Sequence, residues 1–163
     1  MTVICIELPE KMDYSDYLNI EDLIADSHQY FLSDLYNEKI RFRGKNIFFF
    51  DSPIIEGYEQ GFYHCTTSSS EMRSGRFHDV DRLERIVWIK SIIMNCDIGF
   101  PCSNDILYWI DPLSKKTHIY LYSEKYLIVL EEKETIYNFI TSFYVDSIPQ
   151  HKKLLRKYDE NKV

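Results

Sequence analysis

Four short runs of β-forming residues fill the C-terminal half of the chain, and short connections separate them. The runs are Ile106 to Ile110, His118 to Tyr122, Tyr126 to Glu131 and Ile136 to Tyr144. The segments between them are polar and contain the proline, serine and lysine residues that are common in turns. Because such short connections join antiparallel neighbours, the runs predict a four-stranded antiparallel sheet.

Two segments that precede this sheet have helical spacing. From Ile20 to about Asn37, apolar residues recur every three or four positions, and Asn19 is placed to cap the first turn. A second helix is predicted from Asp79 to Asn95, and it is apolar on most sides from Ile86 onward. With helices packed against one face of the sheet and this helix buried there, the sequence predicts an α+β fold.

Composition and turn signals assign the remaining segments. Residues 39–50 predict a hairpin that turns at 44–46, and residues 61–66 are typical of a short strand. Residues 67–76 are polar and lack periodicity, which predicts a mobile surface loop. A basic helix is expected after Pro149, with Ser147 as its N-cap.

The net charge of −7 hides a strong asymmetry along the 163 residues. Residues 1–38 carry nine acids and one base, whereas residues 39–163 carry 18 bases and 17 acids. The length predicts a single domain, 1–163, in which the acidic N-terminal helical segment precedes an α+β core (39–146) and a basic C-terminal helix or tail (147–163). An acidic whole-chain charge disfavours non-specific nucleic-acid binding, so any such binding requires a local basic patch.

Several classes of protein are disfavoured by patterns that the sequence lacks. No apolar run is long enough for a membrane helix, no signal-peptide pattern is present, and the four cysteines lack CxxC spacing, so we expect a cytoplasmic protein with reduced thiols. Walker A, GxGxxG, GxSxG and HExxH motifs are also absent. We therefore expect no cofactor and no metal, although Asp79 and Asp81 could bind magnesium instead of capping a helix.

A histidine lies just upstream of a group of basic residues. His64 is followed by Arg73, Arg76, His78, Arg82 and Arg85, and the last predicted strand carries hydroxyls at Thr141, Ser142 and Tyr144. Metal-free cleavage of RNA needs a group that moves protons near neutral pH, which imidazole suits. It also needs cations or hydroxyls that donate to the phosphate oxygens as negative charge grows on them. This combination of residue types therefore favours phosphodiester cleavage.

Each of these residues also has a structural interpretation. His64 could be a satisfied residue of a strand, and Arg82 and Arg85 could pair with the acids of their own helix. Lys90 could extend its charged end to the surface from an apolar helix. The hydroxyls of the last strand are common in strands, and the basic C-terminal segment could contact an RNA backbone or remain solvated.

The order of several short motifs resembles that of one nuclease family. The motifs are Phe62-Tyr63-His64-Cys65-Thr66-Thr67, Arg76, Arg82-Leu83-Glu84-Arg85-Ile86-Val87-Trp88-Ile89, Tyr126-Leu127-Ile128-Val129-Leu130 and Phe139-Ile140-Thr141-Ser142-Phe143-Tyr144. In this order, over residues 62–144, they resemble the phage-associated branch of the barnase–EndoU–colicin–RelE-like nucleases.

The resemblance implies a small α+β fold whose four-stranded antiparallel sheet holds the active site, and metal-independent cleavage of RNA. It implies that His64 transfers protons, that Arg82 or Arg85 grips the scissile phosphate, and that Thr141 completes the pocket. The acidic N-terminal helix has no obvious counterpart in the family. It could cover the basic site, or the chain could bind a partner on a nuclease-like scaffold without catalysis.

The leading hypothesis is a metal-independent endoribonuclease, a toxin or effector of phage or mobile-element origin, that cleaves RNA such as tRNA or mRNA by 2′-hydroxyl attack. The candidate catalytic residues are His64, Arg82, Arg85 and Thr141, and the candidate substrate-binding residues are Arg73, Arg76, Lys90, Ser142 and Tyr144. RNA is the expected partner, and the acidic segment could also bind a cognate inhibitor or another protein.

A second hypothesis is a non-catalytic acidic partner protein, an immunity or inhibitor module whose N-terminal segment binds a basic target. The third hypothesis is a phage structural or packaging accessory protein. The sequence predicts no oligomeric state.

Overall fold

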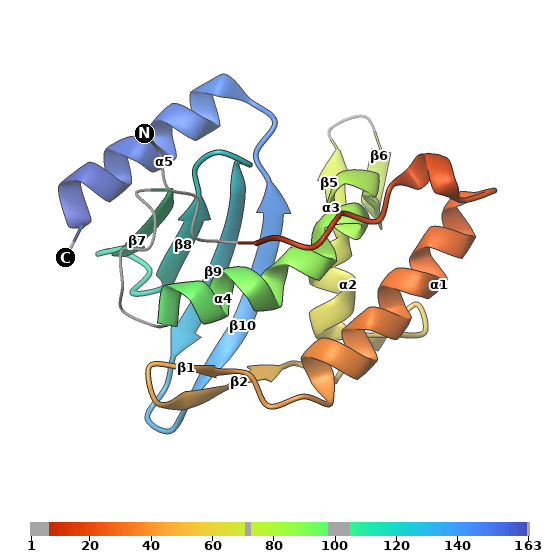
Figure 1. Cartoon of the computed structure of the whole chain (residues 1–163), viewed down its shortest axis with the longest axis horizontal. Helices are drawn as coiled ribbons and strands as arrows, with labels where there is room; N and C mark the ends of the chain where they lie inside the picture. The colour runs from red at the N-terminus through yellow and green to blue at the C-terminus, as the bar shows by residue number, and fades with distance from the viewer. Residues whose placement is uncertain (1–6, 71–72, 98–104, 163) are drawn as a thin grey trace.

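A curled six-stranded sheet is the framework on which the helices pack (Figure 1). The computed structural model describes residues 7–70, 73–97 and 105–162. The strand order is β1-β2-β10-β9-β8-β7, and the strands are β1 (Arg41–Phe42), β2 (Lys45–Phe49), β7 (Ile106–Ile110), β8 (Thr117–Leu121), β9 (Tyr126–Glu132) and β10 (Ile136–Tyr144). The fold is of the α+β class, as the sequence predicts.

The four C-terminal strands are confirmed, but the prediction of a four-stranded, wholly antiparallel sheet is wrong. β7 to β10 form the antiparallel meander, and the predicted hairpin at residues 39–50 becomes β1 and β2 and extends the same sheet. β2 pairs in parallel with β10, with Phe49 opposite Phe139. This pairing joins segments that are far apart in the chain, so the local periodicity of either segment does not reveal it.

Helices cover both faces of the sheet, not one face as predicted. The buried helix expected over residues 79–95 consists of α3 (Val80–Arg85), a 3₁₀ turn η3 (Ile86–Trp88) and α4 (Ile89–Asp97), and α5 (Ile148–Asn161) follows β10. Along β9, Tyr126, Ile128 and Leu130 belong to the larger core with η3 and α4. Leu127 and Val129 alternate with them and belong to a smaller core with α5.

The acidic N-terminal segment lies against α3 and η3. It contains η1 (Tyr14–Asp16), α1 (Ile20–Tyr30) and a π-helical turn η2 (Phe31–Tyr36). The amide of Met12 donates to the Glu84 carbonyl at 2.9 Å, and the amide of Tyr14 donates to the Glu84 carboxylate at 2.8 Å. The indole of Trp88 donates to the Pro9 carbonyl at 2.8 Å. In Figure 1, α1 and α5 lie at opposite ends of the molecule.

Two local predictions between residues 60 and 78 are wrong. Residues 61–66 belong to a helix, α2 (Gln60–Thr66), which follows a small hairpin of β3 (Ile54–Ile55) and β4 (Tyr58–Glu59). Phe62, Cys65 and Thr66 are buried at helical spacing, so burial against the core outweighs the strand propensity of this segment.

The stretch predicted as a mobile loop contains a second hairpin, β5 (Thr67–Ser70) and β6 (Arg73–His78). Serine-rich strands have weak β propensity, which explains why the sequence pattern missed them. Tertiary hydrogen bonds hold the base of this hairpin instead. The Ser68 hydroxyl donates to the Asp79 carboxylate at 2.9 Å, and the Asp79 amide donates to the Thr66 carbonyl at 2.8 Å.

The remaining sequence expectations concern the cap of α5, the thiols and the membrane. Ser147 caps α5 as predicted, accepting a hydrogen bond from the Gln150 amide at 3.1 Å. Cys65 and Cys96 are free thiols, whereas Cys5 and Cys102 lie outside the described residues. None of the described helices is long and apolar enough to cross a membrane.

Candidate functional site

Strand β10 extends beyond its parallel neighbour, and the C-terminal turn of α2 lies beside the extension. β2 ends at Phe49, opposite Phe139, while β10 continues to Tyr144. The pairing of β10 with β9 shifts register between Phe139 and Thr141, at the same point. Beyond this bulge the Thr141 hydroxyl donates to the carbonyl of His64, at 3.5 Å. Beyond Phe139, β10 therefore no longer pairs with β2, and a side chain of β10 contacts the end of α2 instead.

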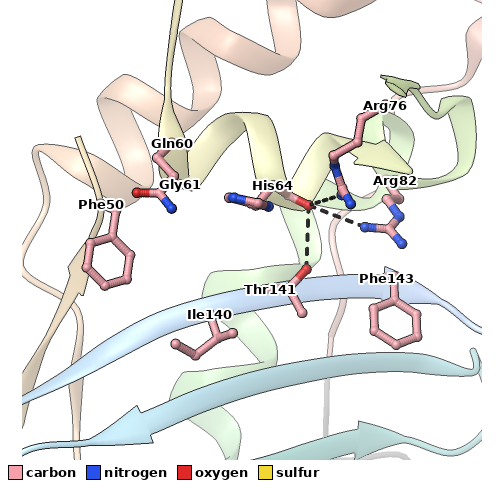
Figure 2. Close-up of a pocket in the computed structure, with 9 residues that line it drawn as sticks. All are labelled: Phe50, Gln60, Gly61, His64, Arg76, Arg82, Ile140, Thr141 and Phe143. Carbon is pink, nitrogen blue, oxygen red and sulfur yellow. Dashed lines mark hydrogen bonds between the residues drawn. The ribbon is translucent and has the colours of Figure 1, made fainter. Parts of the chain in front are cut away.

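A pocket of about 400 Å³ opens at this junction (Figure 2). Its size lies in the range of pockets that bind small molecules, roughly 300–1,000 Å³. α2, β6, α3 and β10 all contribute to its wall, whose described residues are Phe50, Gln60, Gly61, His64, Arg76, Arg82, Ile140, Thr141 and Phe143. Four of the nine candidate residues from the sequence are therefore brought together: His64, Arg76, Arg82 and Thr141.

Two guanidinium groups and one hydroxyl meet at the C-terminal end of α2. Nη2 of Arg76 donates to the His64 carbonyl at 3.4 Å, and Nη1 of Arg82 donates to it at 3.3 Å, beside the Thr141 hydroxyl (Figure 2). Three donors exceed the two lone pairs of one carbonyl oxygen, and all three bonds are long. These groups therefore retain hydrogen-bonding capacity for an anionic ligand.

Arg76 is fixed by Thr67, the first residue of β5. Its Nε donates to the Thr67 hydroxyl at 2.9 Å, and its Nη2 donates to the Thr67 carbonyl at 2.5 Å. The Thr67 hydroxyl in turn donates to the Tyr63 carbonyl at 2.5 Å, and this hydroxyl is buried. The guanidinium of Arg76 is thereby oriented before any ligand arrives.

Arg82 approaches the pocket from the first turn of α3. Asp79 caps this helix, and its carboxylate lies 3.9 Å from Nε of Arg82. The guanidinium carbon is 5.1 Å from the centre of the Phe143 ring, a cation–π contact. Only 17% of the side chain is exposed, and this burial lowers the pKa of Arg82. A guanidinium stays charged in proteins, so the pocket holds a desolvated cation.

His64 lines the pocket, and in Figure 2 its imidazole extends toward Gln60, whereas its backbone carbonyl faces Arg76 and Arg82. Burial lowers the pKa of His64 below its ordinary value of 6.5, and the charges of Arg76 and Arg82 lower it further. Within the described part of the chain, neither ring nitrogen has a hydrogen-bond partner. At neutral pH the ring is therefore neutral and able to accept a proton.

Of the other two arginines of the sequence prediction, Arg85 lies away from the pocket, and the side chain of Arg73 is not among those that the structure describes. Arg85 lies outside the described lining: it pairs with Asp81 at 3.2 Å and Glu84 at 3.6 Å, and it lies 4.3 Å from the centre of the Tyr144 ring. This matches the structural interpretation of Arg85 given above. Arg73 lies opposite Ser70 in the β5–β6 hairpin, and its side chain is outside what the structure describes.

Three other candidate residues also lie away from the pocket. Ser142 is buried and accepts a hydrogen bond from the Tyr126 hydroxyl at 2.8 Å, because alternation along β10 turns it away from Thr141. Tyr144 lies beneath Arg85, on the same side of β10 as Ser142. Lys90 pairs with Glu38 on the surface of α4.

Sequence reasoning missed Phe50, Gln60, Gly61, Ile140 and Phe143. Gln60 precedes His64 by one helical turn, but this spacing has meaning only if residues 60–66 are helical. Phe143 is two positions after Thr141 in a correctly predicted strand, so strand alternation could have found it. Ile140 and Phe50 depend on the bulge and on the parallel pairing, for which the sequence carries no local signal.

The described residues contain no group of three or more His, Cys, Asp or Glu side chains that could hold a metal ion. Comparisons of the chain with models of protein families, with curated proteins and with solved structures found no match. The resemblance of the motifs to a nuclease family therefore stays a prediction. The geometry itself describes a pocket lined by two guanidinium groups, an imidazole and apolar side chains.

Proposed function

We propose that the chain is a metal-independent endoribonuclease and that RNA is cleaved in the pocket of His64. The observation that carries this proposal is the placement of one imidazole and two guanidinium groups in the same pocket, with Arg76 and Arg82 both within hydrogen-bonding distance of the His64 carbonyl. Phosphate fits this charge, and the aromatic walls suit a nucleobase.

In the proposed reaction, the RNA 2′-oxygen attacks the adjacent phosphorus while the ring of His64 accepts the 2′-hydroxyl proton. The bond from phosphorus to the 2′-oxygen forms, and the bond to the 5′-oxygen breaks; the leaving oxygen takes a proton from water. Arg76 and Arg82 donate to the non-bridging oxygens, where negative charge grows, and Thr141 adds a hydroxyl donor. The products are a 2′,3′-cyclic phosphate and a free 5′-hydroxyl.

The test is cleavage of total RNA by the purified full chain in the presence of a chelator. We expect cleavage products ending in 2′,3′-cyclic phosphate, and loss of at least about a hundredfold in rate for His64→Gln. His151→Gln is the matched control, because His151 lies on α5, contacts the Tyr120 hydroxyl and is outside the described lining of the pocket. Intact RNA at an equimolar concentration of protein would refute the proposal, as would equal rates for the two variants.

The exposure of acidic side chains on α1 supports the acidic partner protein as a second candidate function. Glu21, Asp22 and Asp26 are exposed on α1, and the described lining of the pocket begins only at Phe50. None of the described residues of the acidic segment lines the pocket, and these exposed carboxylates remain available to a basic protein. Capture of such a protein, lost in the triple variant Glu21→Gln, Asp22→Asn and Asp26→Asn, would support this function. The phage or mobile-element origin, the choice of tRNA or mRNA and the cytoplasmic location all remain predictions.

A further inference from the structure

The lining of the pocket changes in chemical character along its length. In Figure 2, Arg76 and Arg82 lie at one end, Phe50 and Gln60 lie at the other, and His64 lies between them. The end at Phe50 therefore has an aromatic ring and a neutral amide but no charged group among its described residues. A ligand whose phosphate binds at the arginine end would therefore place an uncharged part of itself at the Phe50 end.

The aromatic surface continues beyond the pocket along β2. Ile47 and Phe49 are buried in the larger core, so the alternating residue Phe48 faces the other side of the sheet. Phe48 is 40% exposed, so part of its ring is accessible to a ligand. The rings of Phe48 and Phe50 meet edge to face with their centres 5.7 Å apart. Together they form a continuous aromatic surface that leads into the pocket.

A charge contact marks the far end of this surface. Phe48 lies opposite Asn138 in β10, and Asn138 lies opposite Glu131 in β9. The Glu131 carboxylate is 3.1 Å from Nζ of Lys133, which offsets its charge. An incoming phosphodiester chain is therefore attracted at Arg76 and Arg82, and the charge of Glu131 near Phe48 is offset by Lys133.

We propose that Phe50 and Phe48 stack two unpaired bases next to the phosphate held by Arg76 and Arg82, and that Gln60 hydrogen-bonds the edge of the base on Phe50. The substrate is therefore a single-stranded segment of RNA. This inference rests on the proposed function and names its substrate class. Aromatic rings that stack bases beside cations are the general means of binding single strands, and duplex bases cannot offer their faces in this way. An amide supplies both donors and an acceptor for a base edge.

The experiment is fluorescence anisotropy of a labelled 2′-O-methyl hexanucleotide with the full chain, because the methyl group blocks the nucleophile and keeps binding separate from cleavage. Comparison ligands are the same oligomer with abasic sugars and its blunt duplex. We expect the base-bearing single strand to bind roughly a hundredfold more tightly than the abasic oligomer, the magnitude of two stacked bases. We expect the duplex to bind no better than the abasic oligomer.

Variants of Phe48 distinguish stacking from a structural role. Phe48→Leu should weaken binding of the base-bearing oligomer by roughly tenfold without changing binding of the abasic oligomer, while Phe48→Tyr should retain affinity because the ring remains. Phe77→Leu is the matched control, since Phe77 is 41% exposed on β6, outside the described lining of the pocket. Thermal unfolding of every variant verifies that it is folded.

The possible outcomes separate the two proposals. Equal affinity for the base-bearing and abasic oligomers, or a duplex bound as tightly as the single strand, would overturn the stacking platform even if RNA is cleaved. A Phe48→Leu variant that binds like the original chain would overturn it as well. If Arg82→Gln leaves the binding of all three ligands unchanged, the phosphate site of the proposed nuclease fails, and the platform fails with it.

Discussion

At the scale of single residues, the surroundings of His64, the proposed proton acceptor, set its pKa. Burial, followed by the charges of Arg76 and Arg82, places the pKa of His64 below 6.5. A general base must be unprotonated, so cleavage is expected to fall with decreasing pH only once the pH passes below this lowered pKa.

Because Arg76→Gln removes a neighbouring positive charge, it should raise the pKa of His64 and move the acidic limb of the pH profile to higher pH. The measurement is kcat/KM from pH 4.5 to 8; an unmoved limb would exclude His64 as the base.

Two arginines on one helical segment provide a second prediction at this scale. Arg82 lines the pocket, whereas Arg85 pairs with Asp81 and Glu84. Arg82→Gln is expected to lower kcat/KM by roughly a hundredfold, as the loss of one preorganised donor to a charged transition state does. Arg85→Gln should instead lower the free energy of unfolding by about 1 kcal/mol, because the nearly buried Glu84 loses a partner. The measurements are cleavage rates and urea unfolding of both variants. Loss of cleavage in Arg85→Gln but not in Arg82→Gln would contradict the proposed site.

At the scale of elements, the placement of α2 depends on a close approach at Gly61. Its amide donates to the Phe50 carbonyl at 2.7 Å, and a Cβ at this position would lie 3.0 Å from that same oxygen. Because this neighbour is backbone, Gly61→Ala should displace α2 and destabilise the chain by about 1–3 kcal/mol. The displacement would move Gln60 and His64, so RNA cleavage should fall as well.

A glycine elsewhere separates these two effects. Gly44 in the β1–β2 turn has a φ of +83° with open space around it, so Gly44→Ala introduces backbone strain away from the pocket. Both variants should lose stability in urea unfolding, but only Gly61→Ala should lose cleavage beyond what its unfolded fraction explains. Equal retention of cleavage would show that α2 does not position the site.

The helices and strands differ in how well the sequence predicts them. The sequence predicts the strands from residue 106 onward and the helix from residue 79, because each carries its own apolar period and its own turn or cap. The sequence predicts a strand in place of α2, because seven residues rich in β-forming side chains contain too little helical period to oppose that propensity. His64, Arg76, Arg82 and Thr141 could be selected by their chemistry, but their convergence depends on a parallel pairing and a bulge that only the three-dimensional fold reveals.

At the scale of the whole molecule, four histidines share a lowered pKa. Burial is the main cause for His64, His78, His118 and His151 alike. Because their pKa in the folded chain lies below that in the unfolded chain, the unfolded chain binds protons first as the pH decreases. The free energy of unfolding should therefore decrease once the pH falls below about 6.5, well above the range where carboxylates titrate.

Urea unfolding at intervals from pH 7.5 to 5 measures this dependence. Nδ1 of His78 is buried without a hydrogen-bond partner in the described structure, so His78→Gln is a suitable variant for reducing the slope. A stability that is flat over this interval would contradict the assignment of lowered pKa values to these histidines.

The bond pattern at the end of α2 has one further consequence. The His64 carbonyl accepts hydrogen bonds from Arg76, Arg82 and Thr141, the same donors that the proposed phosphate would use. The carbonyl oxygen of His64 thus uses the donors that an anionic ligand would need. An anion that takes these donors would remove hydrogen bonds that hold the last turn of α2. Binding of the anion and loosening of that turn are therefore coupled.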